Sequence, residues 1–119
     1  RFFDRQVFDQ RLFYEESLAA VRYGQKLALA SGCFVQVNLS AAGYQLNRAA
    51  NCNSGAFSAA VLKPDGEVGY ANLQVPAGVV ISSTGFPVVF DSLGRPAAAA
   101  SANVGNFTIS VAAVTGLVQ

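Results

Sequence analysis

The first quarter of the chain has the periodicity of an amphipathic helix. Residues 9–31 contain no proline and consist mainly of Leu, Ala, Glu, Gln, Lys and Arg, which favour helices. At 100° per residue, the charged residues Glu15, Arg22 and Lys26 share one face. The apolar residues on the opposite face are Phe13, Ala20, Leu27 and Ala28. The pattern predicts a helix over about 9–31, and the mixed residues 1–8 are compatible with an extension of it.

The apolar face of this helix is small at its centre. Ser17 and Gly24 lie seven residues apart, which is two helical turns, and both fall among the apolar positions. A glycine costs a helix about 1 kcal/mol relative to alanine, so close packing against a sheet is the expected compensation. Gly32 is expected to end the helix in the left-handed conformation.

The remainder of the chain alternates with the period of two that is typical of strands. The predicted strands are 33–40, 44–48, 57–62, 67–70, 78–83, 88–91 and 106–111. Residues 63–66, Lys-Pro-Asp-Gly, suit a tight turn, and the Ala-rich segment 96–105 is expected to be a mobile surface loop. The order predicts an α+β fold: one long helix covers one face of antiparallel sheet with about six to eight short strands.

Composition restricts the class of protein. The 119 residues are 52% hydrophobic and 13% charged, which predicts one folded domain over 1–119 with its own core. The net charge is only +1, and the eight Lys and Arg are scattered, so nucleic-acid binding through a basic face is not expected. No apolar run of about 20 residues is present to span a membrane.

The chemistry available to an active site is sparse. The chain has no histidine, which removes the commonest general base, the commonest transition-metal ligand and every triad that needs one. Glu15 and Glu16 are adjacent on the predicted helix and project about 100° apart, so they cannot act together on one substrate. The sequence therefore predicts no catalytic residue, metal site or cofactor, and a protein that is not an enzyme.

Cys33 and Cys52 are the only cysteines and are candidates for a disulfide. A bond between them would close a loop of about 20 residues and contribute about 3 kcal/mol to stability. Such a bond would indicate an oxidising compartment. The alternative, two reduced thiols in the core of a cytosolic protein, remains open at this point.

Two further features have more than one interpretation. The charged face with Glu15, Arg22 and Lys26 can be solvated, or it can contact another helix in an assembly where charges set the register. The chain begins at Arg1 and contains no methionine, so we expect that an upstream segment, such as a signal peptide or a membrane anchor, has been removed.

Three segments together resemble a known family. They are LAAVRYGQKLALASGCFVQV (18–37), FPVVFDSLGRP (86–96) and NFTISVAAVTGLVQ (106–119). Their order and spacing are similar to those of the type IV minor pilins and pseudopilins of the GspH/FimT class. Within that class, QKLALASGC followed by a second cysteine is most similar to minor pilins of the mannose-sensitive haemagglutinin pilus. Gly24 and Gln25 depart from the commoner Ala-Arg pair.

The resemblance implies a pilin-like fold and a structural role. The full protein would be anchored in the inner membrane by the missing upstream helix, with a periplasmic head, and would then enter an extracellular pilus or a periplasmic pseudopilus. Its partners would be other major and minor pilins, and the isolated head would be monomeric. The alternatives are a type II secretion pseudopilin and a minor pilin that binds DNA or a surface ligand. Members that bind DNA carry a basic C-terminal region, and residues 97–119 contain no Lys or Arg.

Overall fold

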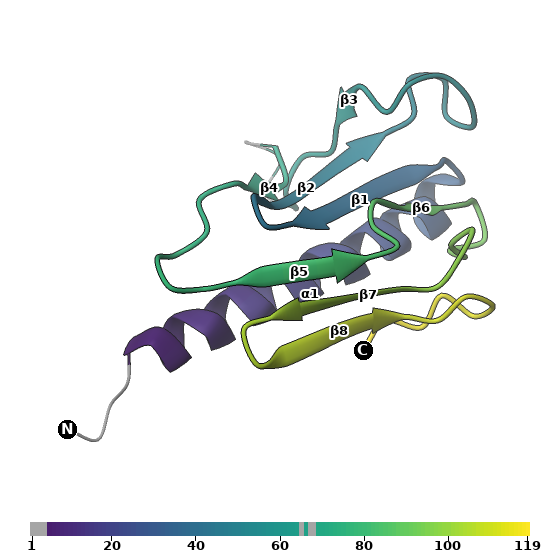
Figure 1. Ribbon diagram of the computed structural model, residues 1–119. Helices are drawn as coiled ribbons and strands as arrows, with labels where there is room; N and C mark the ends of the chain where they lie inside the picture. Colours follow the sequence, from purple (N-terminus) through teal and green to yellow (C-terminus); the bar gives the residue numbers. More distant parts are fainter. Residues whose placement is uncertain (1–4, 65, 67–68) are drawn as a thin grey trace.

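A long helix lies along one face of two antiparallel sheets in the computed structural model (Figure 1), which describes residues 5–64, 66 and 69–119. The helix is α1 (Arg5–Ser31), and all eight strands of the described residues follow it. The α+β class, the long N-terminal helix and the antiparallel sheets were predicted correctly. The finer pilin-like description stays a prediction.

Helix α1 includes residues 5–8, so it begins before residue 9. Residues 1–4, which the sequence also allowed in the helix, lie outside the described residues. The end of α1 is as predicted. Gly32 adopts a φ of 72°, and its N–H donates to the carbonyl oxygen of Ala28 at 2.9 Å. This left-handed residue satisfies a helix-end carbonyl and turns the chain toward the first strand.

The first sheet is built on a hairpin. Strands β1 (Val35–Ser40) and β2 (Gly43–Arg48) pair along their whole length, and β6 (Val88–Phe90) pairs with the other side of β1. Two short strands, β3 (Ala59–Ala60) and β4 (Ala71–Asn72), pair with opposite ends of β2. The sheet order is therefore β3-β2-β1-β6, and β4 pairs with the end of β2 that β3 leaves free.

The second sheet has the order β5-β7-β8, with β5 (Ile81–Thr84), β7 (Ala100–Val104) and β8 (Phe107–Val111). Its central strand lies in the segment that was expected to be a mobile loop, so that prediction is wrong for residues 100–104. Ala100, Ala102 and Val104 are buried and alternate with exposed residues. Alanine contributes little hydrophobicity, so the period of two was hidden by the Ala-rich composition.

Several strand boundaries also differ from the prediction. Of the predicted strand 57–62, only Ala59–Ala60 is a strand. The predicted strand 67–70 begins outside the described residues, and the strand found there is Ala71–Asn72. Asp65 of the predicted turn at 63–66 lies outside the described residues, but the Gly66 N–H donates to the Lys63 carbonyl at 2.7 Å, as a tight turn requires.

The core lies between α1 and the two sheets. Its side chains alternate along the strands, as predicted for β1, where Val35, Val37 and Leu39 have no exposed surface. The helix contributes the buried side chains of Phe13, Ser17, Ala20, Val21 and Ala28. Burial of these apolar groups supplies most of the free energy that holds the helix on the sheets.

The helix approaches the first sheet closely at Gly24. A Cβ atom placed there would overlap the Cγ2 methyl group of Val37, so no larger residue fits without movement. Ser17, two turns earlier, is also completely buried, and its hydroxyl has no hydrogen-bond partner among the described residues. Gly24 therefore makes the close contact with the sheet that was predicted for it, and Ser17 is buried as its place on the apolar face predicted.

Candidate interaction surface on helix α1

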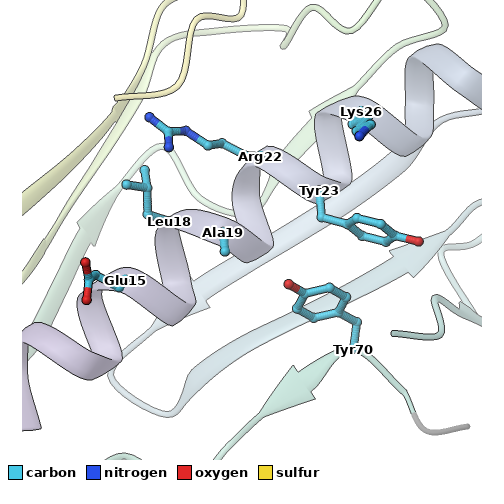
Figure 2. A pocket seen from close by; sticks show the side chains of 7 residues that line it. All are labelled: Glu15, Leu18, Ala19, Arg22, Tyr23, Lys26 and Tyr70. Carbon is cyan, nitrogen blue, oxygen red and sulfur yellow. The ribbon is translucent and has the colours of Figure 1, made fainter. Parts of the chain in front are cut away.

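The face of α1 that is turned away from the sheets carries a shallow groove. The side chains of Glu15, Leu18, Ala19, Arg22, Tyr23 and Lys26 line it, together with Tyr70 from the segment before β4. Its volume is about 480 Å³. Figure 2 shows Ala19 in the middle of these side chains. Because its side chain is only a methyl group, it leaves a space that the larger side chains around it enclose. We call this feature the helix groove.

The lining residues have the spacing that one helix offers to another. Glu15, Leu18, Ala19 and Arg22 stand at positions i, i+3, i+4 and i+7, and the set from Ala19 to Lys26 repeats this spacing. In helix packing, four residues with this spacing form the hole that receives one side chain of the facing helix. The helix groove therefore has the form of two successive holes that share Ala19 and Arg22.

One wall of the helix groove is held by stacked aromatic rings. The rings of Tyr23 and Tyr70 lie 5.1 Å apart at an interplanar angle of 29° and face one another in Figure 2. The Tyr44 ring meets the edge of Tyr70 at 6.2 Å and Phe13 at 5.7 Å. This series of rings connects the helix groove to the core, so the Tyr23 ring packs on aromatic side chains that extend to buried Phe13.

A carboxylate anchors this aromatic wall. Oε1 of Glu16 accepts a hydrogen bond from the Tyr44 hydroxyl at 3.0 Å and another from the Asn72 side-chain amide at 3.1 Å. Burial, and then the hydrogen bond to Glu16, raise the pKa of Tyr44 well above its ordinary value. Burial also raises the pKa of Tyr70, and electrostatic repulsion from Tyr23 and Glu16 raises it further. Glu16 thus fixes β2 and β4 to one side of α1.

The other side of α1 is held by the C-terminal tail, residues 112–119. The Gln25 side-chain amide donates to the carbonyl oxygens of Gly94 at 2.9 Å and Gly116 at 2.7 Å. The Arg22 guanidinium donates to the carbonyl oxygen of Val118 at 3.3 Å. The tail in turn pairs with β8, because the backbones of Ser110 and Gln119 exchange two hydrogen bonds of 2.9 Å.

These contacts refine the predicted charged face. Glu15, Arg22 and Lys26 are all exposed and all line the helix groove. Arg22 differs from the other two, since its side chain extends toward the C-terminal tail of the same molecule (Figure 2). The prediction that the three residues share a face is therefore correct, but Arg22 also has an internal structural contact.

A second groove adjoins the first at Tyr23. Its lining comes from the end of α1, the end of β2 and the segment 60–64, and its volume is about 340 Å³. The lining includes Tyr23, Leu27, Arg48, Leu62 and Lys63. We call this feature the edge groove, because it lies at the β3 edge of the first sheet.

Cys33 and Cys52 form a disulfide, which is the pairing that the sequence suggested, with their sulfur atoms 2.07 Å apart. The bond connects the end of α1 to the polar loop after β2. The Phe34 N–H also donates to the Cys52 carbonyl at 2.8 Å. Neither cysteine lines the two grooves, so the disulfide supports the framework of the surface and not the surface itself.

Sequence reasoning missed several residues of this region. Tyr23, Tyr70 and the Glu16–Tyr44 pair were not identified, and neither was Gln25 as a contact to the tail. Each of these contacts joins residues that are far apart in the sequence, by 28 positions for Tyr44 and Glu16 and by 91 for Gln25 and Gly116. A single sequence carries no signal for such pairs, although uncharged Gln25 beside the charged face was a visible irregularity.

Comparisons with known proteins identify no relative of this chain: no family model matches it, and neither the curated proteins nor the solved structures yield a match. Within the described residues, α1 lacks a stretch long and apolar enough to cross a membrane. The same residues contain no group of three or more His, Cys, Asp or Glu that could hold a metal ion. The fold and the two grooves are therefore the features from which a function can be argued.

Proposed function

We propose that this protein is a non-enzymatic structural subunit, a minor pilin or pseudopilin of the GspH/FimT class. The three sequence segments that resemble this class support the proposal. A long N-terminal helix packed on antiparallel sheets also supports it, since that arrangement is compatible with a pilin-like head. The proposal covers a type IV pilus and a type II secretion pseudopilus, because either filament would use this kind of subunit.

The observation that carries the proposal is the difference between the two faces of α1. One face is buried against the sheets, with Gly24 in direct contact with Val37. The opposite face presents the helix groove, whose spacing suits the side chains of a second helix. A helix with one face packed and the other shaped as a row of holes is suited to assembly with neighbouring helices.

In this function the residues of the helix groove contact neighbouring subunits. Glu15 and Lys26 would set the register between helices through complementary charges, and Arg22 would add to this while it holds the tail. The upstream part of the full protein would anchor it in the inner membrane with a periplasmic head. Other pilins of the same filament would be its partners after assembly, with the sheets and loops on the filament exterior.

The test uses the full-length gene in its own cells. The gene is deleted and then restored as wild type, as Arg22→Glu/Lys26→Glu, or as Arg95→Glu, which changes a cation outside both grooves. Filaments are counted by electron microscopy, secretion is assayed in parallel, and antibodies locate the protein on filaments. We expect the deletion and the double variant to lose filaments or secretion and the Arg95 control to retain them.

Two results would contradict this proposal in different ways. Normal filaments and secretion in the deletion strain, with no antibody label on any filament, would exclude a filament subunit. Normal assembly with Arg22→Glu/Lys26→Glu would leave the subunit role intact and exclude the helix groove as a contact between subunits.

A further inference from the structure

The two grooves form one continuous surface of uneven charge. They share Tyr23, and four of the eight Lys and Arg of the chain line them: Arg22, Lys26, Arg48 and Lys63. Glu15 is the one carboxylate among the described residues that line either groove. Although the whole chain has a net charge of only +1, this surface is locally basic.

The floor of this surface is apolar. Leu18 and Ala19 form this floor in the helix groove and Leu27 and Leu62 form it in the edge groove, and the Tyr23 ring, which is a wall of the helix groove, adjoins both. The Leu62 side chain is 49% exposed. An apolar floor with a charged rim is the usual composition of a protein interface, in which apolar side chains fill the centre and charges select the partner.

We propose that the joined grooves bind an acidic helical segment of a different protein, and not a second copy of this chain. That segment would place an apolar side chain over Ala19 and carboxylates beside Lys26 and Lys63. Its identity as another subunit of the same filament rests on the proposed function. Its acidic, helical character does not, because it follows from the charges and shape of the grooves.

The charges disfavour a second copy as the occupant. Two identical surfaces in contact would bring four cations and one carboxylate from each side together. Each Glu15 could neutralise one cation of the other copy, and the remaining cations would repel one another. A partner with carboxylates around an apolar centre removes this repulsion and uses the same floor.

The shape disfavours a nucleic acid. Phosphate binding uses cations placed along a strip, and most of its affinity comes from those charges. Here the cations stand at the rim of a floor that includes Leu18, Ala19 and Leu62, and Glu15 lies among them. Leucine and alanine floors suit a protein side chain better than a phosphate backbone.

The experiment is site-specific photo-cross-linking in the full-length protein in its own cells. A photoreactive phenylalanine analogue replaces Ala19 in one strain and Leu62 in another, and mass spectrometry identifies the attached peptide. We expect both positions to capture the same protein, other than this chain, through a helical segment with several Asp or Glu residues. Capture of a second copy, of a segment without acidic residues or of nucleic acid would overturn the proposal.

Charge reversal tests whether the rim selects the partner. Lys26→Glu/Lys63→Glu should lower the yield of the cross-link about tenfold, since attraction at the rim becomes repulsion. A Lys substitution at the captured carboxylate should restore the yield, and the matched control Arg95→Glu should leave it unchanged. A yield that does not respond to Lys26→Glu/Lys63→Glu would contradict the proposal.

Experiments with the purified protein test the two other occupants, a second copy and a nucleic acid. Sedimentation at low salt should show a monomer, and a duplex DNA oligonucleotide should cause no salt-dependent mobility shift. A dimer that Arg22→Glu/Lys26→Glu dissolves, or a DNA complex that the same substitutions remove, would overturn the proposal. If the captured acidic partner is not a filament component, the proposed function fails while this inference stands. If a second copy is captured within a filament, this inference fails while the proposed function stands.

Discussion

Helix α1 is held by two kinds of contact, and they differ in almost every physical respect. Beneath the helix, Gly24 allows an apolar contact with Val37 of the sheet that leaves no room for a larger side chain, and Ser17 is completely buried two turns away. On its two flanks, Glu16 and Gln25 form hydrogen bonds with the rest of the chain. The first contact depends on size and the second on the direction of donors and acceptors.

The two kinds of contact have different roles in keeping the outer face of the helix exposed. The apolar contact determines how close α1 lies to the sheets, because non-directional packing is limited by van der Waals overlap. The flanking hydrogen bonds limit rotation of the helix about its own axis, since each requires a particular side chain to point at a particular atom. Together they keep the helix groove directed away from the core.

The largest predicted effect comes from filling the space beneath the helix. Gly24→Leu should destabilise the protein by about 3 kcal/mol, because the added side chain must displace the stiff Val37 side chain or lift the helix. Gly24→Ala should cost about 1 kcal/mol, since overlap with Val37 exceeds the gain in helix propensity. Unfolding in urea measures both changes.

The matched control is Ala19→Leu on the exposed face of the same helix. It should change stability by no more than about 0.5 kcal/mol, as surface substitutions usually do. A double variant, Gly24→Ala/Val37→Ala, should be less destabilised than the sum of its single variants, because the smaller Val37 side chain makes room for the new methyl group. Strict additivity would show that the two residues are not in tight contact.

The apolar contact was predictable from the sequence because it repeats along one element. Ser17 and Gly24 stand two turns apart within a helical pattern, and Val35, Val37 and Leu39 alternate within a strand. Each pattern identifies a buried face without knowledge of its partner. The strand at residues 100–104 was missed because two of its buried alternating positions are alanines, and alanine is too weakly hydrophobic to make the pattern visible.

The second predicted effect comes from the flank that holds the tail. Gln25→Ala removes two hydrogen bonds and leaves the carbonyl groups of Gly94 and Gly116 without this donor, at a cost of about 2 kcal/mol. The loss should concentrate in the tail, so the amides of Ser110 and Gln119 should exchange about tenfold faster with solvent. Hydrogen exchange followed by NMR resolves these positions.

Lys26→Ala is the control for this variant, because it changes the neighbouring helix residue without touching the tail contacts. It should leave the exchange rates of both amides unchanged. If Gln25→Ala accelerated exchange equally throughout the protein, or not at all, then Gln25 would not be the residue that fixes the tail to α1.

The flanking contacts could not be predicted, because each depends on where distant segments meet. Gln25 finds its acceptors 69 and 91 positions later, and Glu16 finds Asn72 56 positions later. The positively charged rim of the joined grooves could not be predicted for the same reason, since Arg48 and Lys63 come from other elements than Lys26. Sequence patterning identified the helix side of this surface and not the side that the sheet contributes.

A smaller effect of opposite sign is predicted at Ser17. Its hydroxyl is completely buried and has no hydrogen-bond partner among the described residues, so it lost its hydration without compensation. Ser17→Ala keeps the small size that the apolar contact requires and raises helix propensity, and should stabilise the protein by about 1 kcal/mol. A loss of stability in thermal unfolding would instead show that the hydroxyl is hydrogen-bonded in solution.

The last predicted effect depends on pH and belongs to the Tyr44 flank. Burial and the hydrogen bond to Glu16 raise the pKa of Tyr44 in the folded protein above its ordinary value of 10.0. The neutral phenol therefore favours folding fully below pH 10, and this contribution is lost as the pH rises above 10 toward the folded pKa. Tyr70, whose pKa is also raised, adds to the same slope.

Tyr44→Phe separates the two components of this contact. At pH 7 it should cost about 1 kcal/mol for the lost hydrogen bond to Glu16, because the ring can still pack against Phe13. Above pH 10 its stability should decline less steeply than that of the wild type, and Tyr44→Phe/Tyr70→Phe should decline less steeply still. Parallel stability curves for the wild type and Tyr44→Phe would mean that Tyr44 ionises as readily when folded as when unfolded. Rotation of α1 would then have to be limited mainly by the Gln25 flank.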